Sequence, residues 1–493
     1  MSASSDSLQF FWHDYETFGI SPRRDRPSQF AGIRTNEALE EVGEPLMIYC
    51  QPTRDYLPDP KSCWLTGITP QQCWDRGLPE PEFAKRIMAE LSAPGTVGVG
   101  YNSIRFDDEV TRHLFWRNLL EPYEREFRNG CGRWDLLDVV RCVYALRPDT
   151  LTWPRHDDGR ISFKLEHLSQ ANGLLHEQAH DALSDVRATI GLARLIRERN
   201  ARLWQFCLKL RAKQAVRDEI GHGRPFLHIS GMYGVEQGCI ALVFPLAVHP
   251  SRPNELIVWD LRHDPSALPS LSADEARRRL FTRQEDLAPG ETRLPIKTIH
   301  LNRSPVVVSQ WKTLSDVRAS EVGIDKVQCL AHAQWLAEHG PALAGLWLQL
   351  YQDDASRAAA PADVDEDLYG GFLSQQDRQR LKEVLQLPAE ALAQRAQTGR
   401  LAFDDPRLDE LVFRFRARHH TSQLDEEEQL RWLAHCQARI LEGESGRSID
   451  DYLAAVDELG ASLDDCTDAA QHEKGSALLD ELVAYAEWVA PEM

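Results

Sequence analysis

The sequence lacks the features that mark a membrane protein or a secreted protein. No apolar run reaches the ~18–20 residues that span a bilayer, and residues 1–8 have neither the basic start nor the apolar core of a secretion signal. The ten cysteines are scattered singly, without a C-x-x-C pair, which indicates neither a zinc ribbon nor a disulfide framework. We therefore expect a cytoplasmic protein with reduced thiols.

The sequence also lacks an overall excess of basic residues. The net charge is −20, and it is distributed unevenly: residues 1–200 carry −6, residues 201–350 carry +3 and residues 351–493 carry −17. We interpret acidic runs such as 363–367 and 425–428 as solvated helix faces. The middle segment, whose charge has the opposite sign, is the region best suited to bind a polyanion.

A length of 493 residues exceeds what one hydrophobic core can organise, so the chain is predicted to fold as several domains. In residues 9–200, short apolar strands alternate with segments of helical spacing, which predicts an α/β domain. The strands are expected at 9–12, 45–49 and 96–101, and the helices at 107–120 and 184–196.

The rest of the chain has a different pattern. Residues 201–354 begin with an amphipathic helix at 203–215 and continue with short β-like runs between turn residues, which predicts a small barrel-like domain. These runs are 226–229, 240–246, 256–261, 296–301 and 306–309. Residues 355–493 are rich in helix formers and predict a helical domain, after an Ala-rich linker at 358–362.

Asp14 and Glu16 form the first candidate element of a catalytic site. They follow the apolar run that ends at Trp12 and lie two residues apart, so a strand would point both carboxylates to one face. Adjacent anions repel unless a cation lies between them, and hard oxygen ligands suit Mg²⁺ or Mn²⁺. The alternative is a strand end that emerges into solvent.

Two further elements follow along the chain. Asp107 stands between a strand and a helix, where it could hold a metal or simply cap the helix. His180 precedes Asp185, which falls in the first turns of the next helix and could join a metal cluster. A histidine at that point can take a proton from an attacking water. Together the three elements predict a two-metal 3′→5′ exonuclease.

The same stretch of chain also matches H-E-x-x-H, the pattern of a zinc protease. That interpretation needs His176 and His180 on one helical face, Glu177 as the base and a third ligand such as Glu198. The local sequence forms a poor helix, and the upstream carboxylates would have no role. We favour the exonuclease interpretation, which leaves His176 as a solvent-facing residue.

Longer segments carry more information than these single residues. They are Phe11–Gly19, Arg26–Ala31, Leu65–Pro70, Gly100–Thr111, Trp134–Val139, Leu165–Leu168, His180–Ala182, His228–Gly234, Val306–Trp311, Leu368–Phe372 and Tyr452. Together they resemble the bacterial exonuclease I family, single-strand-specific 3′→5′ exodeoxyribonucleases of the DEDDh superfamily. The resemblance covers nearly the whole chain.

The resemblance implies a multidomain α/β protein. Its parts would be an RNase H-like exonuclease domain (1–200), an SH3-like β-barrel domain (201–354) and a C-terminal helical domain (355–493), which surround a positively charged groove for one DNA strand. It implies a monomer that hydrolyses single-stranded DNA to 5′-mononucleotides in DNA repair and recombination.

The resemblance also implies roles for the candidate site residues. Asp14, Glu16, Asp107 and Asp185 would hold two Mg²⁺ ions, for which Mn²⁺ could substitute, and His180 would be the general base. Asp14 would bridge the two ions, while Glu16 and Asp185 would complete the first metal site.

Substrate and partner contacts are further expectations from the resemblance. The candidate substrate-binding residues are Glu16, Thr17, Arg147 and Lys164. The family often has arginine at the position of Lys164, and lysine loses the bidentate phosphate contact. The aromatic candidates for base stacking are Tyr101, Phe106 and Trp153. The expected protein partner is the acidic C-terminal tail of single-stranded-DNA-binding protein, in a basic pocket near Arg147.

Two other functions stay open at this point. An RNA-trimming exonuclease of the same superfamily would carry the same motifs, because RNA is distinguished through contacts to the 2′ position. The roughly 290 residues beyond the catalytic domain argue against such an enzyme. A non-catalytic DNA-binding scaffold would tolerate loss of the carboxylates, all of which are present.

Overall fold

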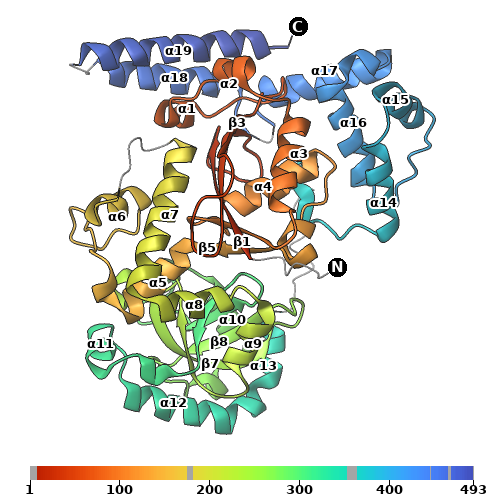
Figure 1. The fold of residues 1–493 in the computed structure, drawn as a ribbon. Helices are drawn as coiled ribbons and strands as arrows, with labels where there is room; N and C mark the ends of the chain where they lie inside the picture. The colour runs from red at the N-terminus through yellow and green to blue at the C-terminus, as the bar shows by residue number, and fades with distance from the viewer. Residues whose placement is uncertain (1–7, 175–180, 352–362, 445, 465–467, 492–493) are drawn as a thin grey trace, which may run out of the picture. The chain divides into compact units, whose positions relative to one another are not determined.

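The computed structural model describes residues 8–174, 181–351, 363–444, 446–464 and 468–491 (Figure 1). The chain divides into two compact units. The first comprises Met1–Gly132, Glu177–Arg187 and Ala359–Met493, and the second comprises Arg133–His176 and Ala188–Ala358. No described helix combines the length and the apolar character needed to cross a bilayer. The nine cysteines within the described residues are free thiols.

A mixed sheet lies at the centre of the first unit. The strands of this sheet that lie wholly within the first unit are β1 (Gln9–Thr17), β2 (Pro27–Thr35), β3 (Leu46–Tyr49) and β4 (Thr96–Gly100), in the spatial order β3-β2-β1-β4. β1 runs antiparallel to β2 and parallel to β4. β1 continues past the predicted end at residue 12 to Thr17, and β2 lies in a segment for which the sequence predicts no strand.

The two faces of β1 have different roles. Phe11 and Tyr15 pack with Phe83 of α3 (Glu80–Leu91) and with Val110 of α4 (Asp107–Arg117) in one buried cluster. Because successive residues of a strand alternate between faces, the even-numbered Asp14 and Glu16 point away from α3 and α4. The hydrophobic core therefore fixes which face carries the carboxylates.

The last part of the chain is helical, as predicted. Its helices are α14 (Gln375–Val384), α15 (Ala389–Gln397), α16 (Arg407–His419), α17 (Glu426–Ile440), α18 (Ile449–Asp464) and α19 (Ala469–Val489). α18 and α19 lie against α1 (Pro60–Thr66) and α2 (Pro70–Arg76) (Figure 1). Cys63, Tyr452 and Leu482 are among the buried residues of this contact.

The acidic run 363–367 is not a solvated helix face, so that interpretation is wrong. Asp365 is only 2% exposed and accepts hydrogen bonds from Arg418 (3.0 Å) and Arg26 (3.4 Å). The Arg418 guanidinium also binds Asp55, at 2.6 and 3.0 Å. Burial makes these charges costly unless they are paired, so the acidic residues fold inward with their arginine partners. The second run, 425–428, is largely exposed and begins α17 with a capping box.

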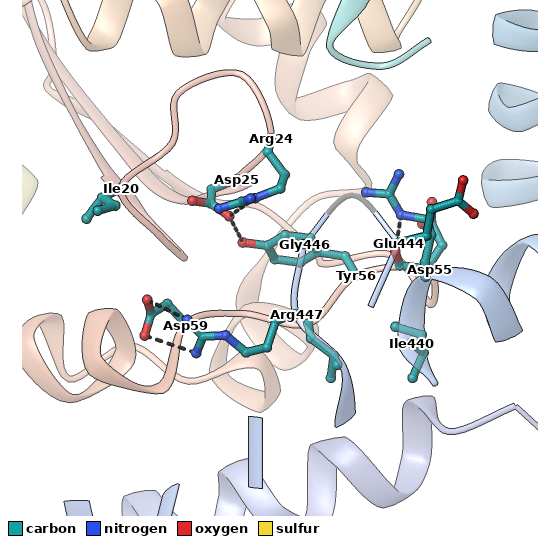
Figure 2. A pocket seen from close by; sticks show the side chains of 12 residues that line it. Ile20, Arg24, Asp25, Asp55, Tyr56, Asp59, Ile440, Glu444, Gly446 and Arg447 are labelled. Atoms are coloured by element: carbon teal, nitrogen blue, oxygen red, sulfur yellow. Dashed lines mark hydrogen bonds and ion pairs between the residues drawn. The ribbon is translucent and has the colours of Figure 1, made fainter. Parts of the chain in front are cut away.

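Several of the polar groups that line a small cavity beside this ion-pair network are paired with neighbouring protein groups (Figure 2). The Tyr56 hydroxyl donates to Asp25 Oδ1 at 3.1 Å, and Arg447 pairs with Asp59 at 2.9 Å. Arg439 donates to the backbone oxygen of Asp55 at 3.1 Å. These contacts make the cavity part of the packing between the α1 region and α17.

The second unit contains an antiparallel sheet in the order β10-β6-β7-β8-β9. The strands are β6 (Phe226–Ile229), β7 (Ile240–Val248), β8 (Glu255–Asp260), β9 (Ile296–His300) and β10 (Val306–Val308), close to the five predicted runs. Pro245 in β7 stands at a break in the register with β8, which is where a strand tolerates proline.

The second unit also contains eight helices within the described residues. They are α5 (Leu136–Leu146), α6 (Leu165–Ala171), α8 (Ala201–Lys209), α9 (Lys213–Ile220), α10 (Ala273–Phe281), α11 (Asp316–Glu321), α12 (Lys326–His339) and α13 (Ala344–Leu350). β5 (Gly132–Asp135) and α7 (Ala182–Arg199) cross the boundary between the units. The single helix predicted at 203–215 is wrong, because the chain turns after Lys209. Leu210 and Val216 are both buried, whereas one continuous helix would point them about 120° apart.

Candidate active site

Three carboxylates converge on the face of β1 that points away from α3 and α4. Asp14 and Glu16 come from β1, and Asp185 comes from the first turn of α7. Each offers an oxygen within 4.8 Å of the others. Within the described ranges this is the only group of three or more potential metal-ligating side chains, and Glu198 is not part of it. The predicted pairing of D-x-E with Asp185 is therefore present in the structure.

A buried glutamine holds the start of α7 against the sheet. Gln29 lies directly opposite Glu16 in the register of β1 and β2, and its Oε1 accepts a hydrogen bond from the Ala182 backbone N–H at 3.2 Å. Asp181 caps the same helix, because its Oδ2 accepts from the Ser184 N–H at 3.1 Å. Gln29 and Asp181 thus position Asp185. Neither residue is predicted as functional from the sequence, although they lie within the segments Arg26–Ala31 and His180–Ala182.

Asp107 is turned toward β1 and does not act as a helix cap. It is the first residue of α4, and the preceding Phe106 occupies the cap position without a side-chain cap bond. Asp107 is 3% exposed, and its Oδ1 accepts from the Tyr15 N–H at 3.2 Å. Thr111, one turn later, bonds the Tyr15 hydroxyl at 3.0 Å. Asp107 is outside the group of three, but α4 holds it beside the two carboxylates of β1.

Each carboxylate of this group makes ionisation of its neighbours unfavourable. Burial raises the pKa of Asp14 well above its ordinary value, and the charges of Asp107, Glu16, Asp185 and Asp181 raise it further. Burial, followed by the charges of Asp185 and Asp181, raises the pKa of Glu16 to about 8. Carboxylates held together at such a cost are typical of functional sites. Their oxygens are the hard donors that Mg²⁺ and Mn²⁺ prefer, so a divalent cation fits this donor set.

The other predicted residues are distributed over both units. The Thr17 hydroxyl in the first unit donates to the Gly19 backbone oxygen at 2.7 Å. In the second unit, Arg147 is exposed and donates to the Thr313 backbone oxygen at 3.4 Å. Lys164 is exposed, with its Nζ 3.8 Å from Glu166 Oε1. The substrate roles of these residues stay predictions.

The three aromatic candidates have different surroundings. Phe106 packs against the core cluster of the first unit, and Tyr101 is half-buried. Trp153 stands edge-on to Tyr144 and Phe163, and its ring N–H donates to Pro148. Base stacking by the three therefore stays a prediction, and for Phe106 and Trp153 the observed packing is against protein groups.

Part of the predicted site falls beyond the described residues. His176, Glu177 and His180 all lie in the stretch 175–180, outside the described residues. The general base and the histidine pair of the zinc-protease interpretation are thus not part of the geometry above. α7 begins only at Ala182.

Family models match three consecutive segments of the chain. Residues 11–193 match the model described as "Exonuclease", which defines the class of the first domain and its carboxylate site. Residues 211–353 match "Exonuclease I SH3-like domain", and residues 362–489 match "Exonuclease I C-terminal domain".

The sequences of individual relatives identify the family. The chain is 43% identical over 439 residues to exodeoxyribonuclease I of Haemophilus influenzae, which covers 88% of this chain and 91% of the relative. It is 41% identical over 438 residues to the Escherichia coli exodeoxyribonuclease I, with 88% and 90% covered. The chain belongs to the exodeoxyribonuclease I family, which acts as a 3′→5′ exonuclease.

Solved structures agree with this assignment over nearly the full length. An exonuclease I from Methylocaldum szegediense superposes with a TM-score of 0.90 at 43% identity, covering 98% of this chain and 99% of that one. The E. coli exonuclease I in complex with a dA16 oligonucleotide has a TM-score of 0.89 at 39% identity, covering 98% and 100%.

These findings decide between the interpretations that the sequence left open. The predicted three-part fold, an exonuclease part, an SH3-like part and a helical part, is confirmed. The zinc-protease interpretation is wrong, and the family also decides against an RNA-trimming enzyme and a non-catalytic scaffold. The predicted domain boundaries at 200/201 and 354/355 stay predictions, since the compact units group the chain differently.

Proposed function

We propose that this chain hydrolyses single-stranded DNA from its 3′ end to 5′-mononucleotides, in DNA repair and recombination, with two Mg²⁺ ions as cofactors. The observation that carries the proposal is the convergence of Asp14, Glu16 and Asp185 oxygens within 4.8 Å in an exonuclease fold. E. coli exonuclease I, which this chain resembles, has been solved with single-stranded oligonucleotides and in a zinc-bound complex with single-stranded DNA.

Asp14, Glu16 and Asp185 would hold the metal, with Asp107 beside Asp14. When bound, the ions would neutralise the phosphodiester and stabilise the attacking and leaving oxygens. His180 would take a proton from the attacking water as the general base. Gln29 and Asp181 keep the α7 carboxylate in register with β1 through the hydrogen bonds described above.

The predicted substrate contacts include residues of each unit. Glu16 and Thr17 would contact the end of the strand, and Arg147 and Lys164 would contact its phosphates as exposed cations. An ExoI/SSB-Ct complex has been solved for a relative with a TM-score of 0.88. We infer that the acidic tail of single-stranded-DNA-binding protein binds here too, near Arg147. Free, mostly buried thiols suit a cytoplasmic protein, which we expect to act as a monomer.

The test uses end-labelled single-stranded DNA, duplex DNA and matching RNA, each with Mg²⁺ and with EDTA. We expect cleavage only of single-stranded DNA and only with Mg²⁺. Asp14→Asn should remove cleavage yet retain DNA binding, whereas the exposed Asp274→Asn, on α10, should match the wild type. Equal cleavage of RNA would overturn the substrate, and an active Asp14→Asn variant would overturn the metal assignment.

A further inference from the structure

A pocket of about 620 Å³ opens in the first unit beside the carboxylates. Its volume is within the usual range for small-molecule sites. Four parts of the chain line it: the sheet, the α1–α2 region, the start of α7 and α19. The residues are Gln29, Tyr49, Trp64, Leu65, Thr66, Gly67, Ile68, Gln72, Asp181, Gln471, Lys474, Gly475 and Leu478.

Two links make this pocket continuous with the proposed metal site. Gln29 lies opposite Glu16 across β1 and β2, and directly opposite residues share one face of a sheet with Cβ atoms about 4.5–5.5 Å apart. Asp181, on the pocket wall, caps the helix whose first turn carries Asp185. A group bound in the pocket would therefore lie next to the carboxylates, on the same face of the sheet.

The α1 wall presents apolar surface to this space. α1 ends at Thr66 because Gly67 adopts the left-handed conformation, with φ of 69°. Leu65 on its last turn is 60% exposed, although it lines the pocket next to Ile68. An exposed leucine beside a polar site offers a contact surface for a base or a sugar.

Close packing fixes α19 as the opposite wall. A Cβ at Gly475 would lie 2.7 Å from the Trp64 ring on α1, so the absence of a side chain there lets the helices approach. The Gln71 side chain also donates to the Glu481 backbone oxygen at 2.5 Å. These contacts with α1 and α2 hold the preceding residue, Lys474, at the rim of the pocket.

Lys474 carries the charge that a polyanion would require. Of the described lining residues it is the one cation, and Asp181 is the one anion. Lys474 is exposed, and no ion pair involves it within the described part of the chain. It stands out in a segment, residues 351–493, whose net charge is −17. Lysine binds phosphate as a compact point charge on a flexible stem.

Under the proposed function the end of the DNA strand lies at this pocket, and we propose that Lys474 of α19 binds the strand's phosphodiester backbone. The last long helix of the chain is then part of the substrate site, opposite Leu65, which contacts the nucleotide. This inference rests on the proposed nuclease function and adds a substrate-binding residue from the C-terminal segment to it.

The test compares Lys474→Gln and Lys474→Arg with the wild type, using a 5′-labelled oligo-dT strand. Lys61→Gln is the matched control, because Lys61 is an exposed lysine on α1 that pairs with Glu458 and does not line the pocket. KM and kcat are measured with Mg²⁺, and the binding constant is measured in EDTA over a range of salt concentrations. Thermal unfolding monitors the fold.

Lys474→Gln should raise KM about 3–10-fold and leave kcat within about twofold of the wild-type value. The magnitude of the negative slope of log K against log salt should decrease by roughly 0.7, as expected for the loss of one phosphate contact on a single strand. Lys474→Arg should restore both values, and Leu65→Ala should raise KM without lowering thermal stability. A Lys474→Gln variant with the KM and salt slope of Lys61→Gln would overturn the pocket assignment alone. A wild-type chain that leaves oligo-dT intact would instead overturn the nuclease function, while the binding arm would still test Lys474.

Discussion

Replacing Asp185 with asparagine should stabilise the metal-free protein while removing its nuclease activity. Asp14, Glu16 and Asp185 hold carboxylate oxygens within 4.8 Å of one another, and like charges at that distance repel. Asparagine has the shape of aspartate without its charge, so the first turn of α7 keeps its packing. The variant therefore removes repulsion together with a proposed metal ligand.

The magnitude follows from Coulomb's law. At the upper limit of that separation, 4.8 Å, two unit charges repel by on the order of 3 kcal/mol at an effective dielectric constant of about 20. Asp185 takes part in two of the three pairs. Burial and the neighbouring charges raise the pKa of Asp14 and bring that of Glu16 to about 8, so partial protonation already removes some of this repulsion. The lost attraction to the α7 N-terminus costs about 0.3–1 kcal/mol. A net gain of about 1–2 kcal/mol remains.

Thermal unfolding at pH 8 in EDTA and in excess Mg²⁺ measures the effect. Asp185→Asn should unfold a few degrees above the wild type in EDTA. Mg²⁺ should raise the transition of the wild type, since a ligand of the folded state stabilises it, and should raise that of the variant less. The exposed Asp274→Asn should match the wild type under both conditions. An Asp185→Asn variant that unfolds below the wild type in EDTA would refute the argument from repulsion.

Two further predictions concern stability. Arg418→Met should destabilise the first unit by about 3–5 kcal/mol, because it leaves Asp55 and Asp365 buried without their shared partner. Arg431→Met, which breaks an exposed pair, should cost no more than about 1 kcal/mol, and equal losses in urea denaturation would contradict the role of burial. Burial lowers the pKa of His228 to about 3, so between pH 6.5 and about 3 only the unfolded state binds this proton. The second unit should then lose up to about 1.4 kcal/mol per pH unit as pH falls through that range. His228→Gln should flatten this slope, and an unchanged slope would assign it to other groups.

The fold was predictable where local patterns are strong. The apolar runs of the second unit correspond to β6–β10, because each strand buries its own side chains. β2 escaped prediction because its polar Ser28 and Gln29 and the small Gly32 give no alternating pattern. All three are buried by neighbouring strands and helices, which are distant in sequence.

The candidate site could likewise be predicted only in part from the sequence. The two-residue spacing of Asp14 and Glu16 placed both carboxylates on one face, since strand geometry is local. The role of Gln29 depends on the register between β1 and β2 and on the position of the α7 N-terminus. Neither is encoded in a short segment, so pattern analysis could not identify Gln29 as a positioning residue.

The acidic last third shows why a count of charges is a poor guide to function. Its sum of −17 describes the segment as a whole and does not say where each charge lies. Asp363 and Asp365 bind Arg414 and Arg418 of the same segment in the interior, so these pairs cancel, and the excess acid lies on other side chains, such as the exposed Glu426 and Glu427. The charges that a DNA strand meets are those at the surface of its path. One exposed lysine, Lys474, at the rim of a pocket beside the carboxylates can therefore bind phosphate in a segment that is strongly acidic as a whole.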